Sequence, residues 1–236
     1  DEGGLLNRIG LNCVSAEEAA EKLEDANQNC FAVSIAETND LSITGDKAIE
    51  DIVYSYNLLK EFGIYTAIDV SCPNTCDGRT FQDSKIFSEL VYSLREEGKG
   101  KPIVFKVSPD LKLKDIEKLL VISEDFADGY EAVNTLFTRH HKYAHGGLSG
   151  PILREYTIAT VSFLRKVSGK TILGVGGIST GRDSYALEQA GANAFLVYTG
   201  FCYKHKENPY AGPSFAYKII EEHFRLRKEA EKKGCM

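Results

Sequence analysis

The feature of this sequence that most constrains its fold is a repeated alternation of short apolar runs with longer helical patterns. Each run is rich in β-branched residues and is followed, after a loop, by roughly ten to fifteen residues with apolar side chains at helical spacing. Strands are predicted near residues 31–35, 65–70, 103–107, 130–134, 172–175 and 194–198. Strands that alternate with helices form βαβ units, in which a parallel sheet is buried on both faces.

The intervening segments predict helices at residues 47–61, 84–97, 113–122, 156–167, 181–189 and 214–228. Another helix is predicted to begin after Ser15, which can cap it, with Glu18 completing a capping box. An open doubly wound sheet and a closed (β/α)8 barrel both fit this order. The barrel is favoured because the notable residues lie just past the carboxyl ends of successive strands, where barrel enzymes build their sites. We therefore predict one α/β domain over residues 1–236, a parallel (β/α)8 barrel with about six of its eight βα units in this chain.

Composition excludes several classes of protein. A net charge of -6 argues against a nucleic-acid-binding surface, which needs clustered lysine and arginine. No apolar run approaches the ~20 residues of a membrane-spanning helix. The opening DEGGLLNRIG lacks the basic and then apolar order of a signal peptide, so none is expected. The six cysteines are scattered along the chain, which favours a reduced, intracellular protein.

Two glycine-containing loops after the last two predicted strands predict a phosphate site. LGVGGISTG (residues 173–181) runs from a strand through glycines into a helix, and FLVYTG (residues 195–200) follows one strand later. Backbone N–H groups at such turns can donate to an anion, and paired loops of this kind form the common phosphate site of barrels. A third loop, GGLSG (residues 146–150), is a weaker signal because glycine and serine are usual loop residues. The alternative is that the glycines only make tight turns.

The stretch SCPNTCDG (residues 71–78) leaves four interpretations open: a metal clip, a disulfide, packing, or one reactive thiol. A metal site is disfavoured because no second Cys/His pair follows Cys72 and Cys76 at zinc-finger spacing, and we expect no metal. A disulfide is disfavoured in a reducing compartment. Lys106 lies inside the apolar strand of VFKVSPD, so we expect it to meet an anionic or electron-rich group at the barrel mouth. The alternative for Lys106 is an edge position in solvent.

Seven motifs occur in one order along the chain: NRIGLN, VSCPNT, FKVSPDL, VNT, GGLSG, GVGGISTG and VYTG. In that order they resemble the dihydroorotate dehydrogenase family, flavin enzymes of pyrimidine synthesis, over most of the chain. Several motifs resemble the quinone-reducing, membrane-associated class, whereas SCPN is similar to the soluble class, which has cysteine where the quinone class has serine. The resemblance implies an FMN-dependent enzyme that oxidises dihydroorotate to orotate, with a quinone or fumarate as electron acceptor. It implies the mitochondrial inner membrane for the quinone class and the cytoplasm otherwise.

The resemblance also implies roles for individual residues. Cys72 would be the general base that takes a proton from C5 of dihydroorotate while C6 passes hydride to the flavin. The substrate's ring and carboxylate would be held by Asn7, Asn74, Asn134 and Thr135. Lys106 would lie by the pyrimidine edge of the flavin, and Cys76 would have no role. The phosphate and ribityl chain of FMN would be held by Ser149, Gly150, Gly176, Gly177, Tyr198 and Thr199.

Several positions depart from the family pattern. Asp69 and Ser34 stand where the family has asparagines, and Val133 stands where the quinone class has threonine. The family's first two barrel strands would precede Asn7. We therefore expect that the native protein has residues before Asp1 that form them, or that a separate segment or a second copy supplies them. Two alternative functions are a related flavin barrel acting on another dihydropyrimidine and a non-catalytic, flavin-free homologue.

Overall fold

The computed structural model describes residues 4–71, 84–138, 146–202 and 212–233. The chain divides into two compact units. One unit comprises residues 8–131, and the other comprises residues 1–7 together with residues 132–236.

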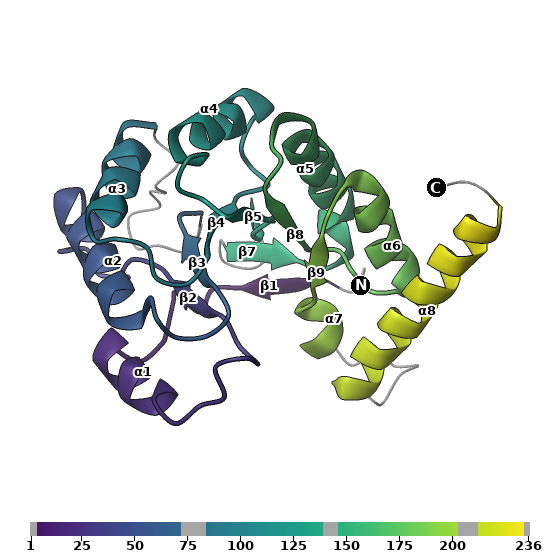
Figure 1. Cartoon of the computed structure of the whole chain (residues 1–236), viewed down its shortest axis with the longest axis horizontal. Coiled ribbons are helices and arrows are strands. Elements are labelled where there is room, and N and C mark those ends of the chain that lie inside the picture. The colour runs from purple at the N-terminus through teal and green to yellow at the C-terminus, as the bar shows by residue number, and fades with distance from the viewer. Residues whose placement is uncertain (1–3, 72–83, 139–145, 203–211, 234–236) are drawn as a thin grey trace. The chain divides into compact units, whose positions relative to one another are not determined.

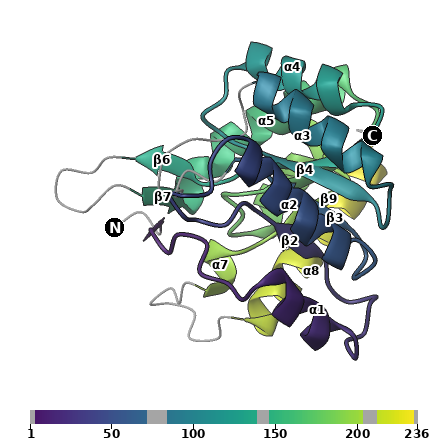
Figure 2. The same cartoon turned by 90° about the vertical axis from the view of Figure 1, so that its left-hand side faces the viewer.

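The unit of residues 8–131 alternates helices with parallel strands. Its elements are α1 (Ala16–Leu23), β2 (Val33–Ile35), α2 (Asp46–Leu59), β3 (Thr66–Asp69), α3 (Ser84–Glu96), β4 (Ile103–Val107), α4 (Leu113–Ser123) and all but the last residue of β5 (Gly129–Ala132). The strands lie in the order β2-β3-β4-β5, and β3 pairs with its neighbours β2 and β4 in parallel. In the register of β3 with β4, Asp69 lies opposite Lys106. Figures 1 and 2 show α2, α3 and α4 running side by side along one face of these strands.

The core of this unit follows from its apolar strands and the apolar faces of its helices. Strand β4 has the sequence IVFKV, in which every residue but the lysine is buried. Phe105 of this strand meets Phe87 of α3 edge to face, with ring centroids 5.2 Å apart. Tyr56 of α2 is fully buried and donates its hydroxyl to the backbone oxygen of Gly98. Burial of the helix faces holds α2 and α3 against the sheet, which fixes the carboxyl ends of β3 and β4.

The other unit contains a second group of parallel βα elements and a small antiparallel sheet. Its elements are β1 (Leu5–Asn7), β6 (Leu136–Thr138), β7 (Gly146–Ser149), η1 (Pro151–Leu153), α5 (Arg154–Val167), β8 (Thr171–Val175), α6 (Gly181–Ala190), β9 (Ala194–Leu196), α7 (Thr199–Cys202) and α8 (Pro213–Lys232). Strands β8 and β9 pair in parallel, and β1-β7-β6 form the antiparallel sheet, whose strands β6 and β7 lie side by side in Figure 2.

Each strand and helix predicted from the sequence is confirmed, with ends displaced by a few residues. The sequence did not predict β1, β6, β7, η1 or α7. These elements are three or four residues long, too short to show a period, and β7 has the sequence GGLS, which disfavours a strand. Ser15 caps α1 by accepting a hydrogen bond from the Glu18 amide at 3.3 Å. The Glu18 carboxylate pairs with Lys22, and a full capping box is found instead at Thr180 and Asp183.

None of the helices within the described ranges is both long and apolar enough to cross a bilayer. Those same ranges contain no group of three or more histidine, cysteine, aspartate or glutamate side chains placed to hold a metal ion.

Candidate functional site

The turn after β8 is built from two glycines that the structure requires for different reasons. Gly176 and Gly177 have φ angles of +112° and +75°, in the region that side chains with a Cβ rarely adopt. A Cβ on Gly177 would also lie 2.5 Å from both the backbone nitrogen and the Cα of Arg154. Backbone atoms cannot give way as a flexible side chain can. The GVGGI turn is therefore held tightly against the first residue of α5.

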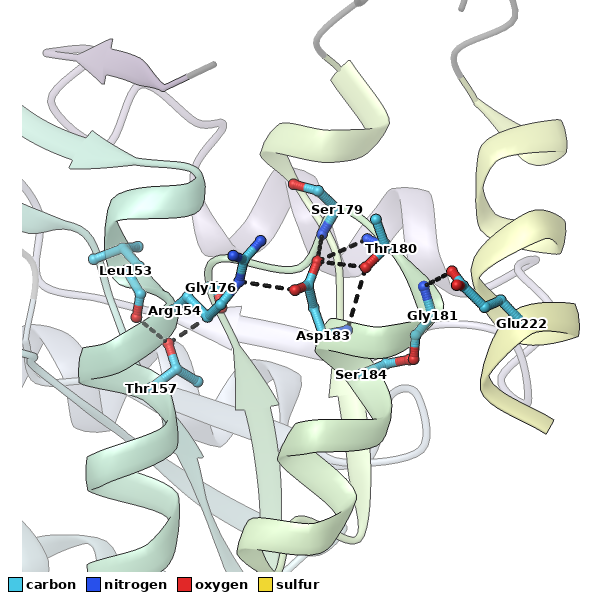
Figure 3. A network of polar contacts seen from close by, with 10 residues as sticks. All are labelled: Leu153, Arg154, Thr157, Gly176, Ser179, Thr180, Gly181, Asp183, Ser184 and Glu222. Carbon is cyan, nitrogen blue, oxygen red and sulfur yellow. Dashed lines mark hydrogen bonds and ion pairs between the residues drawn. The ribbon is translucent and has the colours of Figure 1, made fainter. Parts of the chain in front are cut away.

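Thr157 of α5 fixes the start of the same turn. Its buried hydroxyl lies 2.9 Å from the Leu153 oxygen, 3.2 Å from the Val175 oxygen and 3.2 Å from the Gly176 oxygen. A hydroxyl has one hydrogen to donate, so these carbonyl groups share it. Figure 3 shows this threonine between Leu153 and Gly176. The arrangement links the end of β8 to α5 by side-chain as well as backbone contacts.

The amides just before α6 and at its first residue already donate to carboxylates of the chain. Asp183 accepts from the amides of Ser179 and Thr180 at 2.9 and 2.8 Å and from the Thr180 hydroxyl at 2.9 Å. Gly181 donates its amide to Glu222 of α8 at 2.8 Å (Figure 3). The sequence predicted that an external anion would meet amides between the glycines and this helix. Because the amides of Ser179, Thr180 and Gly181 already donate to carboxylates, an external anion could bind only to amides that precede Ser179 in this turn.

Arg154 balances the charge of the Asp183 carboxylate. Its Nε lies 2.8 Å from Asp183 Oδ1, a contact that is ionic and not an aligned hydrogen bond (Figure 3). An opposite charge at this distance reduces the repulsion that Asp183 would exert on an anion beside the glycine turn.

Two further loops meet the glycine turn. Thr199 at the start of α7 donates its hydroxyl to Ser149 Oγ at 2.7 Å, and Ser149 Oγ lies 3.3 Å from the Leu5 oxygen, to which it donates. A Cβ on Gly200 would lie 2.9 Å from the Ile178 oxygen, so the start of α7 also touches the glycine turn. In the described part of the chain, the amides of Gly177 and Thr199 donate to no other group.

The remaining residues predicted for this loop cluster lie within it by sequence position. Gly150, with φ +101°, follows Ser149 directly and precedes η1. Tyr198 precedes Thr199, and its side chain is 65% exposed. The structure therefore brings together the three glycine-containing loops that the sequence singled out. The cluster contains two open amide donors, and backbone amides are donors suited to a phosphate.

A different group of functional side chains lies at the carboxyl ends of β3, β4 and β5 in the unit of residues 8–131. Lys106 Nζ is 3.2 Å from Glu131 Oε1 and 3.7 Å from Asp69 Oδ2. The Lys106 side chain is 21% exposed, and that of Glu131 is 8% exposed. The anionic partner expected for Lys106 is thus a pair of carboxylates from neighbouring strands.

Asp69 also organises the chain that follows β3. Its Oδ1 accepts from the Ser71 amide at 3.0 Å and from the Ser71 hydroxyl at 2.9 Å. Ser71 is the last described residue before Cys72. Cys72, Asn74 and Cys76 lie in residues 72–83, outside the described residues, so the interpretations of the two cysteines stay predictions.

The pKa of Tyr65 is affected by the same charged side chains. Burial raises the pKa of the Tyr65 phenol, the charge of Glu131 raises this pKa further, and Lys106 opposes that effect. Glu131 itself was missed from the sequence. The sequence does contain a signal for this residue. A glutamate stands inside the apolar run before VNT, in the strand that follows the one carrying Lys106.

The other predicted residues are placed as follows. Asn7 ends β1, where it is paired with Gly147, and Asn134 Oδ1 accepts from the Thr135 amide at 2.7 Å. Val133 is buried and donates its amide to the Val175 oxygen at 2.7 Å, so its apolar side chain belongs to the core. Ser34 lies in the middle of β2 with an exposed side chain.

Parallel βα units with glycine turns after their last strands define an α/β protein of the (β/α)-barrel class. The sequence model described as dihydroorotate dehydrogenase matches residues 1–222, and the chain belongs to this family. Among curated relatives, a dihydroorotate dehydrogenase (quinone) of Thermus thermophilus is 33% identical across 98% of this chain and 67% of its own length. The enzyme of the same name from Christiangramia forsetii is 30% identical across 94% of this chain and 67% of its own length.

Solved structures agree with this fold. A dihydroorotate dehydrogenase from Eimeria tenella in complex with ferulenol superposes with a TM-score of 0.83 over 97% of this chain and 69% of that chain, at 24% identity. The ligand-free type from the same organism gives a TM-score of 0.82 over 99% of this chain and 72% of that chain, at 25% identity. These matches confirm the predicted fold class, a partial (β/α)8 barrel. The chain spans about two thirds of the length of the two curated relatives named above.

Proposed function

We propose that this protein is an FMN-dependent dihydroorotate dehydrogenase that oxidises dihydroorotate to orotate in pyrimidine biosynthesis, with residues 1–236 as one barrel domain. Family membership and the shared name of the quinone-class relatives support the reaction. The observation that carries the cofactor assignment is the meeting of three loops around Ser149, Gly177 and Thr199, where two amides have no partner within the described residues.

The residues of the loop cluster fit an FMN phosphate. In the proposed site, the Gly177 and Thr199 amides donate to phosphate oxygens, and the Thr199 hydroxyl, which donates to Ser149 Oγ, holds the Ser149 loop beside them. Ser149, Gly150, Gly176 and Tyr198 line the phosphate and the ribityl chain. The nearby Asp183 carboxylate is matched by Arg154, which reduces its repulsion of the phosphate. Glycine at positions 176 and 177 lets the anion approach the backbone closely.

The reaction requires a base and groups that orient the substrate. Bound FMN supplies the acceptor for the hydride from C6 and passes electrons on to a second substrate. Cys72 is proposed to take the proton from C5. An unperturbed thiol has a pKa of about 8.5 and is only a few per cent thiolate at pH 7, so Cys72 needs an activating neighbour. Asn7, Asn74, Asn134 and Thr135 are proposed to hold the substrate's ring and carboxylate by hydrogen bonds.

The electron acceptor is proposed to be a quinone and not fumarate, because the named curated relatives carry that class in their names. A quinone is dissolved in a membrane, so this acceptor places the protein at a membrane surface, which in a mitochondrion is the inner membrane.

The proposal is tested by purifying the full chain, titrating it with FMN and following the quenching of FMN fluorescence. Saturable binding that Gly177→Val abolishes supports the phosphate assignment. Formation of orotate from dihydroorotate with a soluble quinone supports the reaction. Absence of both FMN binding and orotate formation would instead favour the flavin-free homologue.

A further inference from the structure

Lys106 is held between two carboxylates that come from the strands on either side of its own. Strand β4 carries Lys106, β3 contributes Asp69, and β5 contributes Glu131. The shorter contact, 3.2 Å, is to Glu131, the more buried of the two carboxylates. These three side chains together carry one positive and two negative charges.

Burial makes the contact with Glu131 hard to break. A carboxylate that is almost fully covered by protein is stable only when it is paired, because removing its partner leaves an uncompensated charge in a poorly solvating environment. If Lys106 turned toward a ligand and away from Glu131, it would leave such a charge behind. Asp69 is in turn fixed by its two hydrogen bonds from Ser71. The ammonium group is therefore held from both sides of β4.

We propose that Glu131 is a positioning residue for Lys106 and that, with Asp69, it offsets the positive charge that Lys106 presents at these strand ends. The pairing itself does not depend on the identity of the ligand, but its consequence rests on the proposed function. With its charge already matched, Lys106 favours an uncharged acceptor, such as a carbonyl oxygen of an imide ring, over an anionic group. Binding of the substrate carboxylate then depends on the asparagine amides.

The pairing predicts that the chemical reactivity of Lys106 depends on Glu131. Only the neutral amine reacts with an acylating reagent, and a neighbouring carboxylate raises the pKa of a lysine by favouring its charged form. Removing the charge of Glu131 therefore increases the neutral fraction at a fixed pH. Each pKa unit changes that fraction about tenfold.

The experiment measures acylation of individual lysines by acetic anhydride at pH 8 in the full chain, with peptide mass spectrometry as the readout. Glu131→Gln should acylate Lys106 at least about threefold faster than the wild type. Lys99, which pairs with Asp128 at 2.8 Å, is the internal reference and should be unchanged. Asp69→Asn keeps the acceptor oxygen for Ser71 and serves as a second variant if Glu131→Gln does not fold. It should change Lys106 in the same direction by a smaller factor.

A second readout tests the consequence for the ligand. In the FMN-loaded chain, Glu131→Gln should make the midpoint potential of the flavin more positive. With the Glu131 charge removed, less of the Lys106 charge is offset, so Lys106 better stabilises the extra negative charge of the reduced ring. Lys106→Gln should shift it the opposite way.

An unchanged Lys106 acylation rate would overturn the positioning role, as would equal increases at Lys99 and Lys106. Faster acylation of Lys106 with an unchanged flavin potential would overturn only the proposed effect on the ligand, and the positioning role of Glu131 would stand. Failure of the chain to bind FMN would count against the proposed function, and acylation would still decide the pairing.

Discussion

The hydroxyl of Thr199 donates to Ser149 Oγ at 2.7 Å although the two residues are 50 positions apart in the chain. This bond joins the end of β7 to the start of α7. Gly200, the next residue, approaches the Ile178 oxygen closely. Thr199 thus connects the loops around Ser149 and Ile178, and its own amide is a proposed phosphate donor.

Replacing Thr199 with valine should weaken FMN binding by up to about tenfold, or about 1.4 kcal/mol, because the hydrogen bond that holds the Ser149 loop against α7 is lost. The substitution keeps the branched shape of the side chain but removes the hydroxyl, so Ser149 also loses a hydrogen-bond donor. Thr199→Ser is the matched control and should bind FMN within about twofold of the wild type. Fluorescence titration with FMN measures both. Equal FMN affinities of the valine and serine variants would show that the Thr199 hydroxyl does not contribute to FMN binding.

Gly177→Ala should lower both FMN affinity and stability. Its φ of +75° imposes strain of order 1–3 kcal/mol on a residue with a Cβ, and that Cβ would collide with the Arg154 backbone.

Gly98→Ala is the control for strain alone, because Gly98 has nearly the same φ, +73°, but has open space where the Cβ would lie. We expect Gly177→Ala to lower the free energy of unfolding by more than Gly98→Ala does in urea denaturation. Only Gly177→Ala should lose FMN. Equal destabilisation of the two would show that close packing against α5 has no energetic effect.

Cys72→Ala should retain FMN but lose dihydroorotate oxidation by roughly 100- to 10,000-fold, the range typical of removing a general base. Cys76→Ala should change the rate little. Steady-state assays with a soluble quinone, made on protein of known FMN content, give the comparison. A comparable loss in both variants would point to a disulfide or a metal clip formed by the two cysteines.

Tyr130 should make the protein sensitive to alkali. Burial raises the pKa of its phenol well above the usual value, and the charge of Glu124 adds to this effect. Since the folded-state pKa is the higher one, the stabilising contribution is fully present below the unfolded value near 10 and is lost as pH rises above it. The free energy of unfolding of the wild type should therefore fall between pH 10 and 11 more steeply than that of Tyr130→Phe. Parallel pH profiles would contradict this role.

The parallel elements were predictable because their signals are local. Runs such as IVFKV and the apolar face of the following helix show their periods within one segment of sequence. The antiparallel sheet was not predictable, because Asn7 pairs with Gly147, which is far away in the sequence, and neither segment has a strand-like composition. Pairing of this kind is stabilised by tertiary contacts, which a local pattern does not contain.

The candidate site likewise has some features that were predictable from the sequence and some that were not. Gly176, Gly177 and Thr199 were predictable because glycine turns after strands have a recognisable sequence. The hydrogen bond from the Gly181 amide, the first of α6, to Glu222 was not predictable, because Glu222 comes from α8, far along the chain. Lys106 was expected to meet an anion, but the pairing with Glu131 depends on the neighbouring positions of β4 and β5.

The most direct test of the proposed function is the anaerobic addition of dihydroorotate to the FMN-loaded chain, followed by visible absorbance. The proposal predicts that the flavin band bleaches, with one orotate formed for each flavin reduced, and that Cys72→Ala keeps its FMN but bleaches far more slowly. A chain that holds FMN whose band is unchanged by dihydroorotate would contradict the proposed activity.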